Sequence, residues 1–320
     1  MRKDGVSDMK GSERRASGLA ALRAIQPFQQ VENPFIAGMT EDYLAVFKPA
    51  GMHSVRVLAR IGSDTSLDET PNLIAWLERE VPDHCMRFRI PGAKDENENL
   101  ESEEGRIAPA RRRAAIELGM LSRLDRDTSG LILFARSIAA MRRALEIQRS
   151  GGMRKFYRLV AAPNDIVLPG FRPRHRPLPA YETALFLESA TLGGGLAIES
   201  HFRSYGEKGA MVACVSRDEA EHEKKPLSKE IFRTVASRRG QPAIEEFARA
   251  GSAMEIDAMI VSGFRHQIRA HMAWIGYPIA GDRLYGGMQA SRLFLECHRV
   301  EIVVSDAQPM AFELYEGEQN

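Results

Sequence analysis

The chain has 320 residues, of which 44% are hydrophobic and 27% charged, and its formal net charge is +1. This length allows a sizeable buried core, and the composition is typical of globular proteins. Its apolar runs stay well short of the roughly 20 residues of a membrane-spanning helix, and the polar N-terminus lacks the apolar segment of a secretory signal.

The three cysteines are scattered along the chain. Cys85, Cys214 and Cys297 have no paired spacing of the kind that predicts disulfides or a metal site. We therefore expect a cytoplasmic protein with no disulfide, no metal, no other cofactor and no membrane association.

The charges are distributed unevenly. Residues 94–105 are acidic and poor in apolar side chains, which predicts a solvated loop. Residues 106–113 and 171–177 are basic. A basic cluster can bind a phosphate backbone, but an ordinary surface position is the simpler interpretation of each cluster taken alone.

The first third of the chain predicts a strand and a helix. Residues 1–40 are expected to form a partly disordered N-terminal extension. The apolar segment 43–47 predicts a strand that ends at the turn Lys48-Pro-Ala-Gly. Helical spacing of apolar residues predicts a helix over 70–81, with Thr70 as its N-cap and Pro71 in its first position. A polar insertion follows at about 85–113.

The rest of the chain predicts several strands with few helices between them. Ser137 is placed to cap a helix that runs to Gln148 and ends before Gly151-Gly152. A second helix is predicted over 264–275. The predicted strands are 131–135, 155–162, 181–187, 196–203, 256–261 and 299–304. This order favours an α+β fold with a mixed sheet over a regular βαβ succession.

One loop, residues 123–130 (RLDRDTSG), concentrates polar side chains directly before the predicted strand 131–135. Aspartate, threonine and serine often cap turns, which gives a structural explanation of the loop. A functional explanation is an aspartate that the neighbouring arginines hold in its ionised form. The residues alone leave both open for Asp125 and Asp127.

A second group of polar side chains lies at 263–287. On a helix Arg265 and Arg269 would share one face, while Ile268, Met272 and Ile275 would face the core. His266 and His271 are five residues apart, so they do not align on one helical face and do not predict a metal site.

A third group lies on the predicted strand 155–162, where Lys155, Tyr157 and Leu159 share one face. A tyrosine on a strand usually packs in the core or against its neighbours. It can also stack on a base that has left its helix.

Taken together, these segments resemble the pseudouridine synthases that act on ribosomal large-subunit and transfer RNA (the RluA-like family). The resemblance covers roughly residues 40–315 apart from the insertion. It rests on the segments KPAG, RLDRDTSGLILFARS, KFYRLV and HQIRAHMAWIGYPIAGDRLYGG. It implies a catalytic domain over 41–315 and a tail at 316–320. The implied fold is a mixed, largely antiparallel β-sheet with flanking helices and a central cleft.

The resemblance also implies the reaction, which is isomerisation of uridine in RNA (rRNA or tRNA) by a monomer that flips the base out of its stack and needs no cofactor. Asp125 matches the catalytic aspartate, Tyr157 the tyrosine that stacks on the base and takes part in proton transfer, and Arg269 the arginine that pairs with the aspartate. The matched motifs imply six substrate-binding residues: Arg123, Ile268, Lys155, His266, Gln267 and Lys48. Asp125 could attack the sugar or stabilise positive charge on it.

Three segments depart from the family pattern. Ser122 stands where histidine is usual, Phe264-Arg265 where arginine-threonine is usual, and Leu295-Glu296-Cys297 where leucine-histidine-alanine is usual. The intact Asp125, Tyr157 and Arg269 favour an active enzyme over a silent RNA-binding homologue that acts in ribosome assembly. A glycosidase is disfavoured because no second carboxylate is placed by a motif. Asp127 is expected to cap the turn.

Overall fold

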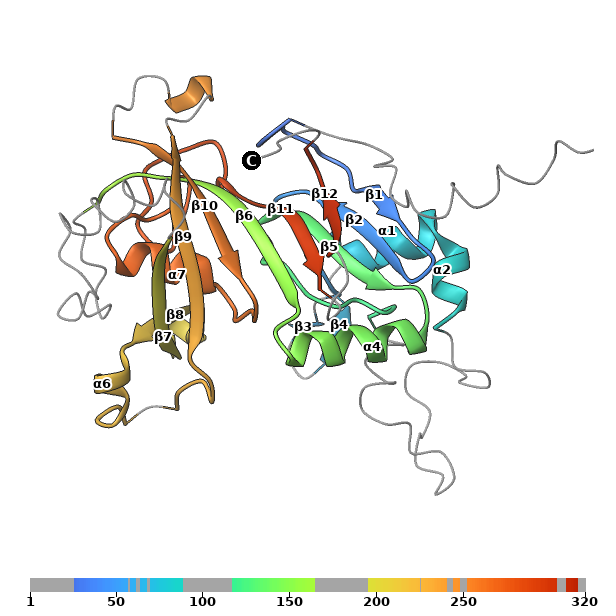
Figure 1. Ribbon diagram of the computed structural model, residues 1–320, viewed down its shortest axis with the longest axis horizontal. Helices are drawn as coiled ribbons and strands as arrows, with labels where there is room; N and C mark the ends of the chain where they lie inside the picture. Colours follow the sequence, from blue (N-terminus) through green and yellow to red (C-terminus); the bar gives the residue numbers. More distant parts are fainter. Residues whose placement is uncertain are drawn as a thin grey trace, which may run out of the picture.

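A ten-stranded sheet runs through the molecule (Figure 1). The computed structural model describes residues 26–56, 58–61, 64–67, 70–88, 117–164, 195–224, 226–240, 244–247, 252–303 and 309–315. The strand order is β1-β2-β5-β11-β6-β10-β9-β7-β8, with β12 paired to β11, and β3 and β4 form a separate two-stranded sheet. Only β5 and β11 pair in parallel among the described strands. The predicted α+β fold with a largely antiparallel mixed sheet is confirmed.

Twelve strands are present in the described residues. Their bounds are β1 (Phe35–Met39), β2 (Tyr43–Lys48), β3 (Leu58–Ile61), β4 (Asp64–Leu67), β5 (Ser129–Ala135), β6 (Met153–Ala161), β7 (Leu196–Tyr205), β8 (Met211–Val215), β9 (Phe232–Gly240), β10 (Met254–Ile260), β11 (Leu295–Ile302) and β12 (Met310–Glu313).

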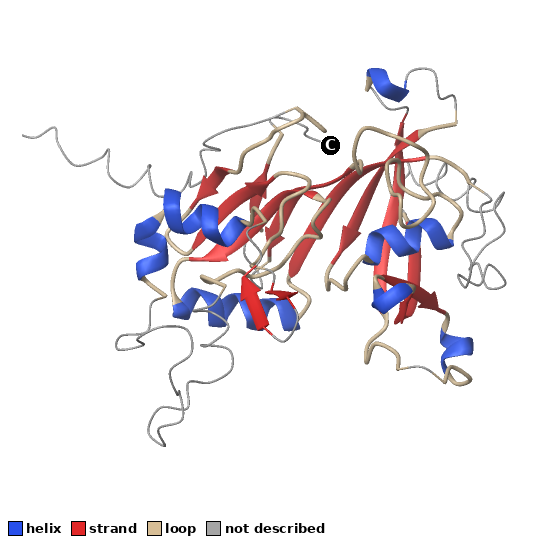
Figure 2. Cartoon of the chain, turned by 180° about the vertical axis from the view of Figure 1, so that it is seen from behind, coloured by secondary structure: helices blue, strands red, loops and turns tan. Residues whose placement is uncertain are grey.

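The helices are short and divide between two lobes (Figure 2). They are α1 (Leu73–Glu80), α2 (Pro82–Met86), α4 (Ile138–Arg149), α6 (Arg217–Ala220) and α7 (Gln267–Trp274), with 3₁₀ turns at Glu207–Gly209 and Glu245–Phe247. Helices α1, α2 and α4 accompany the lobe of β1, β2 and β5. Helix α7 packs on β8 and β9 in the other lobe, and β6 runs between the two lobes.

Two of the three predicted helices, α1 and α7, differ from their predictions at the N-terminus. Helix α1 is capped by Asn72, not by Thr70: the Asn72 side chain accepts a hydrogen bond from the Ala75 N–H at 2.9 Å. Helix α7 begins at Gln267 because His266 has left-handed backbone angles, with φ 56° and ψ 18°. Arg265 therefore lies outside the helix, and the prediction that it shares a helical face with Arg269 is wrong.

Helix α4 confirms its prediction closely. The Ser137 side chain accepts a hydrogen bond from the Ala140 N–H, as expected of the N-cap. Its buried residues are Ala140, Met141 and Ala144, so one face of the helix packs on the sheet.

The sheet begins earlier in the chain than expected. β1 pairs antiparallel with β2, five residues before the boundary placed at residue 40, and Phe28 is buried ahead of it. Strands β1, β3, β4, β8, β9 and β12 were not predicted. The predicted strand 181–187, the basic segment 171–177 and most of the insertion, from 89 onward, lie outside the described residues.

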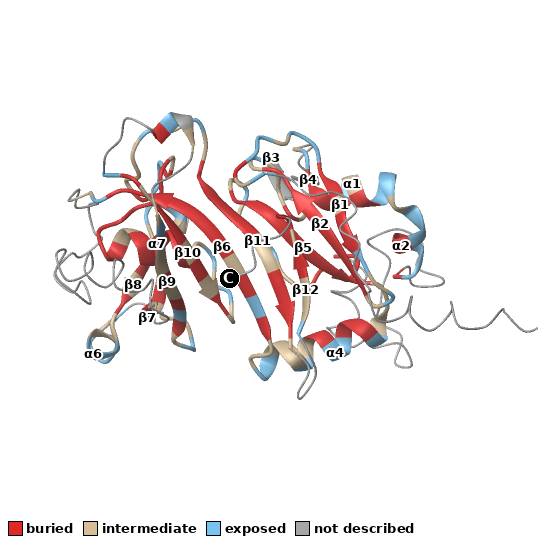
Figure 3. Ribbon diagram, turned by 45° about the horizontal axis from the view of Figure 1, so that its top comes forward, coloured by how far each residue is buried: buried red, intermediate tan, exposed pale blue. Residues whose placement is uncertain are grey.

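All seven residues of β5 are buried (Figure 3). β5 is covered on both edges, by β2 and β11, which explains its continuous apolar run. Gly130 has φ 120°, and a Cβ built there would lie 2.3 Å from the Cys297 carbonyl oxygen. Glycine is required at this position because β11 approaches so closely. The loop 121–128 is thereby anchored at the N-terminal end of a rigid strand.

Candidate active site

A cavity of about 760 Å³ opens between the two lobes, beside the loop 120–128. Its walls also come from α4, from Lys155 and Tyr157 on β6, and from residues 263–269. Eight of the nine predicted site residues line this cavity: Asp125, Tyr157, Arg269, Arg123, Ile268, Lys155, His266 and Gln267. Lys48 is outside the lining.

Lys48 links the loop 120–128 to the turn that follows β2. It is fully buried, and its ammonium donates hydrogen bonds to the carbonyls of Pro49 (2.8 Å), Met52 (2.9 Å) and Arg126 (3.0 Å). All three ammonium protons are therefore used within the protein. Burial lowers the pKa of Lys48 to about 7, and the charges of Asp125 and Asp127 act in the opposite direction. This geometry fits a residue that positions the loop.

Two further contacts hold the loop on the first lobe. The Ser54 hydroxyl donates to the Leu124 carbonyl at 2.7 Å and accepts from the Leu124 N–H at 3.1 Å. The Gly51 N–H donates to the Arg126 carbonyl at 2.9 Å. The backbone on both sides of Asp125 is thus fixed, so its side chain projects into the cavity from a rigid base.

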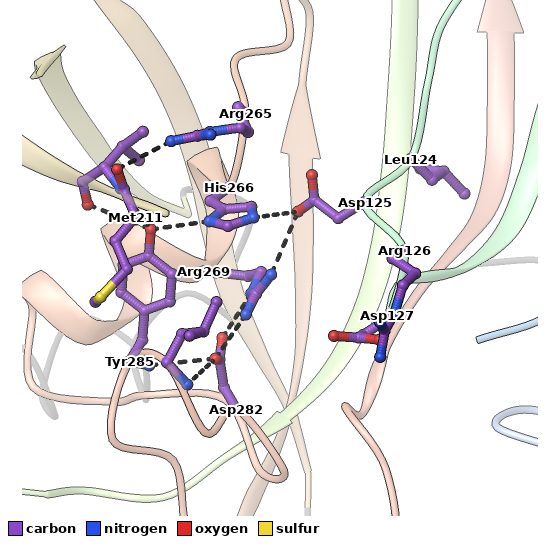
Figure 4. A network of polar contacts seen from close by, with 12 residues as sticks. Leu124, Asp125, Arg126, Asp127, Met211, Arg265, His266, Arg269, Asp282 and Tyr285 are labelled. Carbon is purple, nitrogen blue, oxygen red and sulfur yellow. Dashed lines mark hydrogen bonds and ion pairs between the residues drawn. The ribbon is translucent and has the colours of Figure 1, made fainter. Parts of the chain in front are cut away.

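Asp125 faces two cationic or polar side chains of the second lobe (Figure 4). Its Oδ2 lies 3.7 Å from Nη1 of Arg269 and 4.0 Å from Nε2 of His266. Burial raises the pKa of Asp125, although Arg269, the His266 backbone amide and Lys48 each lower it. The cations favour the ionised form of Asp125, as expected from the sequence, but desolvation of the carboxylate outweighs their attraction, so the net direction of the pKa shift is upward.

Arg269 is held mainly by a second carboxylate, that of Asp282. Its Nε and Nη2 donate to Asp282 at 2.7 and 2.8 Å in a bidentate pair, and both side chains are buried. Burial by itself lowers the pKa of Arg269, but the hydrogen bonds and charge of Asp282, with help from Asp125, raise it overall. Asp282 also accepts from the N–H groups of Leu284 and Tyr285 at 3.1 and 3.2 Å. Arg269 is thus fixed with Nη1 turned toward Asp125.

His266 enters the site as a neutral ring. Burial, followed by the charges of Arg269 and Arg265, lowers the pKa of His266 to about 4. Its Nδ1 lies 3.1 Å from the Tyr285 hydroxyl, which also accepts from the Val212 N–H at 2.9 Å. The same hydroxyl donates to the Val212 carbonyl at 3.3 Å, and Nε2 of His266 points toward Asp125. The left-handed backbone of His266 is a strained conformation of the kind found at functional sites.

Tyr157 and Lys155 form the floor of the cavity on β6. Both are buried, at 5% and 4% exposure. Burial raises the pKa of Tyr157 well above its ordinary value and lowers the pKa of Lys155. Cys297, next to both, has a pKa raised to about 12 by burial. Tyr157 and Cys297 are therefore neutral at physiological pH, and Tyr157 can act as a hydrogen-bond donor there.

Arg123 lines the cavity with about half of its side chain exposed, and its guanidinium pairs with the buried Glu117. Ser122 also lines the cavity. Asp127 does not cap the turn as expected: it accepts from the Arg126 guanidinium at 3.1 Å, while the Thr128 N–H donates to the Asp125 carbonyl. Since Asp127 is half-exposed, solvent screens this pair.

Ile268 and Gln267 complete the wall at the start of α7. Ile268 is 4% exposed and gives the cavity an apolar surface. Gln267 uses its side chain structurally: Oε1 accepts from the Phe264 N–H at 3.0 Å and Nε2 donates to the Arg233 carbonyl at 3.0 Å. These bonds tie the loop before α7 to β9, which leaves Gln267 less free than the substrate-binding role implied.

Asp282 and Tyr285 are functional neighbours that sequence reasoning missed. Both belong to the segment GDRLYGG, which is part of the family resemblance but to which no role was assigned. An available signal was the pair of charges in Arg269 and Asp282, since a buried arginine needs a carboxylate partner. Among the described residues, no group of three or more His, Cys, Asp or Glu side chains could hold a metal ion. In the same part of the chain, no helix is long and apolar enough to cross a membrane.

The family relationship is direct. A family model described as RNA pseudouridylate synthase matches residues 42–274. An "Uncharacterized RNA pseudouridine synthase" of Chloroflexus aurantiacus is 27% identical over 195 residues, covering 58% of this chain and 45% of that protein. "Ribosomal large subunit pseudouridine synthase D" of Xylella fastidiosa is 30% identical over 169 residues, covering 53% of this chain and 37% of that protein.

The aligned part of the chain spans less than half the length of these two relatives. Among solved structures, human RNA Pseudouridylate Synthase Domain Containing 1 superposes with a TM-score of 0.49 at 16% identity, over 90% of this chain and 85% of that chain. A match of this quality supports no inference about the site. The family model, which matches more than two thirds of the residues, shows that the chain belongs to the RNA pseudouridylate synthase family.

Proposed function

We propose that this protein is an RNA pseudouridine synthase, an isomerase that converts uridine within RNA to pseudouridine, with Asp125 as its catalytic carboxylate. The observation that carries the proposal is the placement of Asp125. It projects into a cavity between the lobes, 3.7 Å from an arginine that is itself held by Asp282. Tyr157 and Ile268 line the same cavity, and they are the residues proposed to contact the target base.

The reaction breaks the bond between N1 of uracil and C1′ of the ribose, rotates the base, and joins C5 to C1′. The proton lost from C5 is balanced by the proton gained at N1, so the product is an isomer. Asp125 either attacks C1′ or stabilises the positive charge that develops there. The neutral Tyr157 is placed to stack on the base and to donate a proton, and Nε2 of His266 faces the reacting carboxylate.

The target base has to leave its stack to enter this cavity, at a cost of a few kcal/mol. Stacking on an aromatic side chain offsets that cost by about 1–3 kcal/mol per base. Arg123 is proposed to contact the displaced nucleotide, and to do so it must release Glu117. Lys155, on the β6 side of the cavity, is proposed to contact the substrate through its ammonium group.

We further propose that the RNA is ribosomal or transfer RNA, that the enzyme acts as a monomer without a cofactor, and that it works in the cytoplasm. The names of relatives such as Ribosomal large subunit pseudouridine synthase D support the first point. Free thiols at Cys85, Cys214 and Cys297 are compatible with a reducing compartment.

The test is a comparison of purified wild-type and Asp125→Asn proteins on ribosomal and transfer RNA from cells that lack the gene. Pseudouridines are mapped after incubation. The wild type is expected to modify defined uridines, and Asp125→Asn to be slower by at least about 10³-fold, because the asparagine amide neither attacks nor carries charge. RNA binding without modification by the wild type would favour the silent homologue. Normal turnover by Asp125→Asn would refute the role of Asp125.

A further inference from the structure

The cavity extends beyond the catalytic side chains. Its lining includes Asp125, Tyr157, His266 and Arg269 and also residues of α4, a helix that lies in the opposite lobe from α7 (Figure 1). The volume of about 760 Å³ lies toward the upper end of the roughly 300–1,000 Å³ that drug-sized ligands occupy. A single nucleoside, which is small on that scale, leaves the α4 side unfilled.

The face of α4 that lines the cavity has a distinct chemistry. Met141, Leu145 and Gln148 recur at helical spacing, and Arg149 follows at the last turn. Met141 is buried and Leu145 half-buried, so they give the α4 side of the cavity an apolar surface. The side chains of Gln148 and Arg149 have no hydrogen-bond or ion-pair partner among the residues that the structure describes, and they form a polar edge above it.

We propose that this face of α4 is a second subsite, which binds the base of a nucleotide next to the target uridine. The proposal rests on the proposed function and deepens it. The base would lie on Met141 and Leu145 and present its polar edge to Gln148 and Arg149. Every base has an apolar face and a hydrogen-bonding edge, so this combination fits a base and is not tied to one sequence.

A phosphate is a poorer occupant of the same place. The carboxyl end of a helix carries partial negative charge, and α4 ends at Arg149. The carbonyls of Glu146, Ile147 and Gln148 in its last turn accept hydrogen bonds from residues 150–152. The helix dipole that remains disfavours a phosphate at this position. The guanidinium of Arg149 is therefore expected to read the base edge more than the backbone charge.

The experiment measures binding without turnover, in the Asp125→Asn background. The probe is a short fluorescein-labelled RNA whose central uridine is flanked by adenosines, with versions in which one neighbouring nucleotide is abasic. Anisotropy gives the dissociation constant for each probe with Gln148 and Arg149 intact, with Gln148→Ala plus Arg149→Ala, and with Arg142→Ala. Arg142 is the matched control because it is an exposed arginine on α4 outside the cavity lining.

We expect one abasic substitution to weaken binding about tenfold when the subsite is intact. The double variant should bind the intact probe about tenfold more weakly and lose little further affinity for the abasic probe, because both changes remove the same contact. Arg142→Ala should leave binding within about twofold. Equal weakening by Arg142→Ala, an undiminished abasic effect in the double variant, or no binding of the intact probe would overturn the subsite.

A kinetic arm separates this proposal from the proposed function. On an RNA target that the wild type modifies, the double variant with Asp125 intact should raise KM about tenfold and leave kcat unchanged, the pattern of a lost uniform binding contact. A fall in kcat at unchanged KM would overturn the subsite. The binding cycle as expected, together with no pseudouridine formed by the wild type, would refute the enzymatic function and leave the subsite standing.

Discussion

Two carboxylates adjoin the N-terminal end of β5 and have opposite surroundings. Asp125 lies on the cavity side, in the loop just before the strand. Glu296 lies on the neighbouring strand β11, where it is the register partner of Ser129. Glu296 is fully buried, and it accepts hydrogen bonds from the Ser129 hydroxyl (3.0 Å), the Phe28 N–H (3.2 Å) and the Tyr315 hydroxyl.

Arg292 completes the buried cluster around Glu296. Its guanidinium donates to the Ser129 hydroxyl at 3.1 Å and to the Phe28 carbonyl at 2.8 Å. The cluster thus joins the first described segment, the last described segment and the start of β5. Phe28 and Tyr315 are brought together with β5 by polar contacts as well as by packing.

The difference lies in how well each carboxylate is satisfied. Glu296 has three donors at hydrogen-bonding distance, whereas the side-chain nitrogens of Arg269 and His266 are 3.7 and 4.0 Å from Asp125. A buried carboxylate with all its partners stabilises a fold, and one with its partners slightly out of reach remains available to a substrate. Asp282 belongs with Glu296 in this respect, since it is saturated by Arg269 and two amides.

Among changes to the residues that support Asp125, the largest effect is expected at Asp282, the saturated carboxylate that holds Arg269. Asp282→Asn leaves a buried guanidinium without its counter-charge, which should lower the free energy of unfolding by about 3 kcal/mol. It should also lower kcat by about 10²-fold, because Arg269 no longer holds its place beside Asp125. Denaturant unfolding and single-turnover kinetics measure the two. Asp218→Asn, an exposed acid on α6, is the control, and an unchanged kcat in folded Asp282→Asn would contradict this role.

Glu296→Gln should separate stability from catalysis. The amide keeps the shape but replaces one acceptor by a donor that faces donors, so the free energy of unfolding should fall by about 1–3 kcal/mol. The kcat of the folded protein should stay within about twofold, since Glu296 does not line the cavity. Thermal unfolding and turnover at a temperature well below the transition test this. A loss of kcat larger than the loss expected from unfolding would show that the two carboxylates act together.

The pH dependence of the rate and of the stability should report on Asp125. Because the pKa of Asp125 is raised, the acidic limb of the rate profile should have its midpoint above the ordinary aspartate value of about 3.9. Folding disfavours the ionised form of Asp125. The free energy of unfolding therefore falls as the pH rises from the pKa of Asp125 in the unfolded chain to its higher pKa in the folded protein. Asp125→Asn should therefore be more stable than the wild type at neutral pH, and this advantage should vanish at acidic pH. An advantage that grew at acidic pH would contradict the direction.

The smallest effect is expected at Asp127. The side chain of its ion-pair partner Arg126 is exposed and that of Asp127 is half-exposed. Ion pairs in such surroundings contribute little to stability. Asp127→Asn should change the free energy of unfolding by less than about 0.5 kcal/mol and the rate by less than about twofold. Chemical denaturation and turnover on the same RNA provide the measurement. A large loss in either would mean that the loop depends on both of its aspartates.

Much of the site could be predicted from the sequence because its residues lie in long motifs with defined spacing. Asp125, Tyr157 and Arg269 were named on that basis, and the structure brings all three to one cavity. The α+β class followed from the order of apolar segments, and the cap of α4 from Ser137. These features are local, or depend on motifs, so no knowledge of long-range packing was needed.

Only the tertiary structure decided the electrostatics and the supporting contacts. The net direction of the Asp125 pKa depends on how much water the second lobe removes, and a sequence does not specify that burial. Lys48 does not line the cavity and instead donates hydrogen bonds to three backbone carbonyls, one of them in the loop before β5. The sequence could not predict this contact, because it depends on how β2 packs beside β5. Asp282 and the lining face of α4 likewise become neighbours of the site only when two lobes close around it. Distances between segments far apart in the chain are set by packing, whereas residue types and their spacing are set by the sequence.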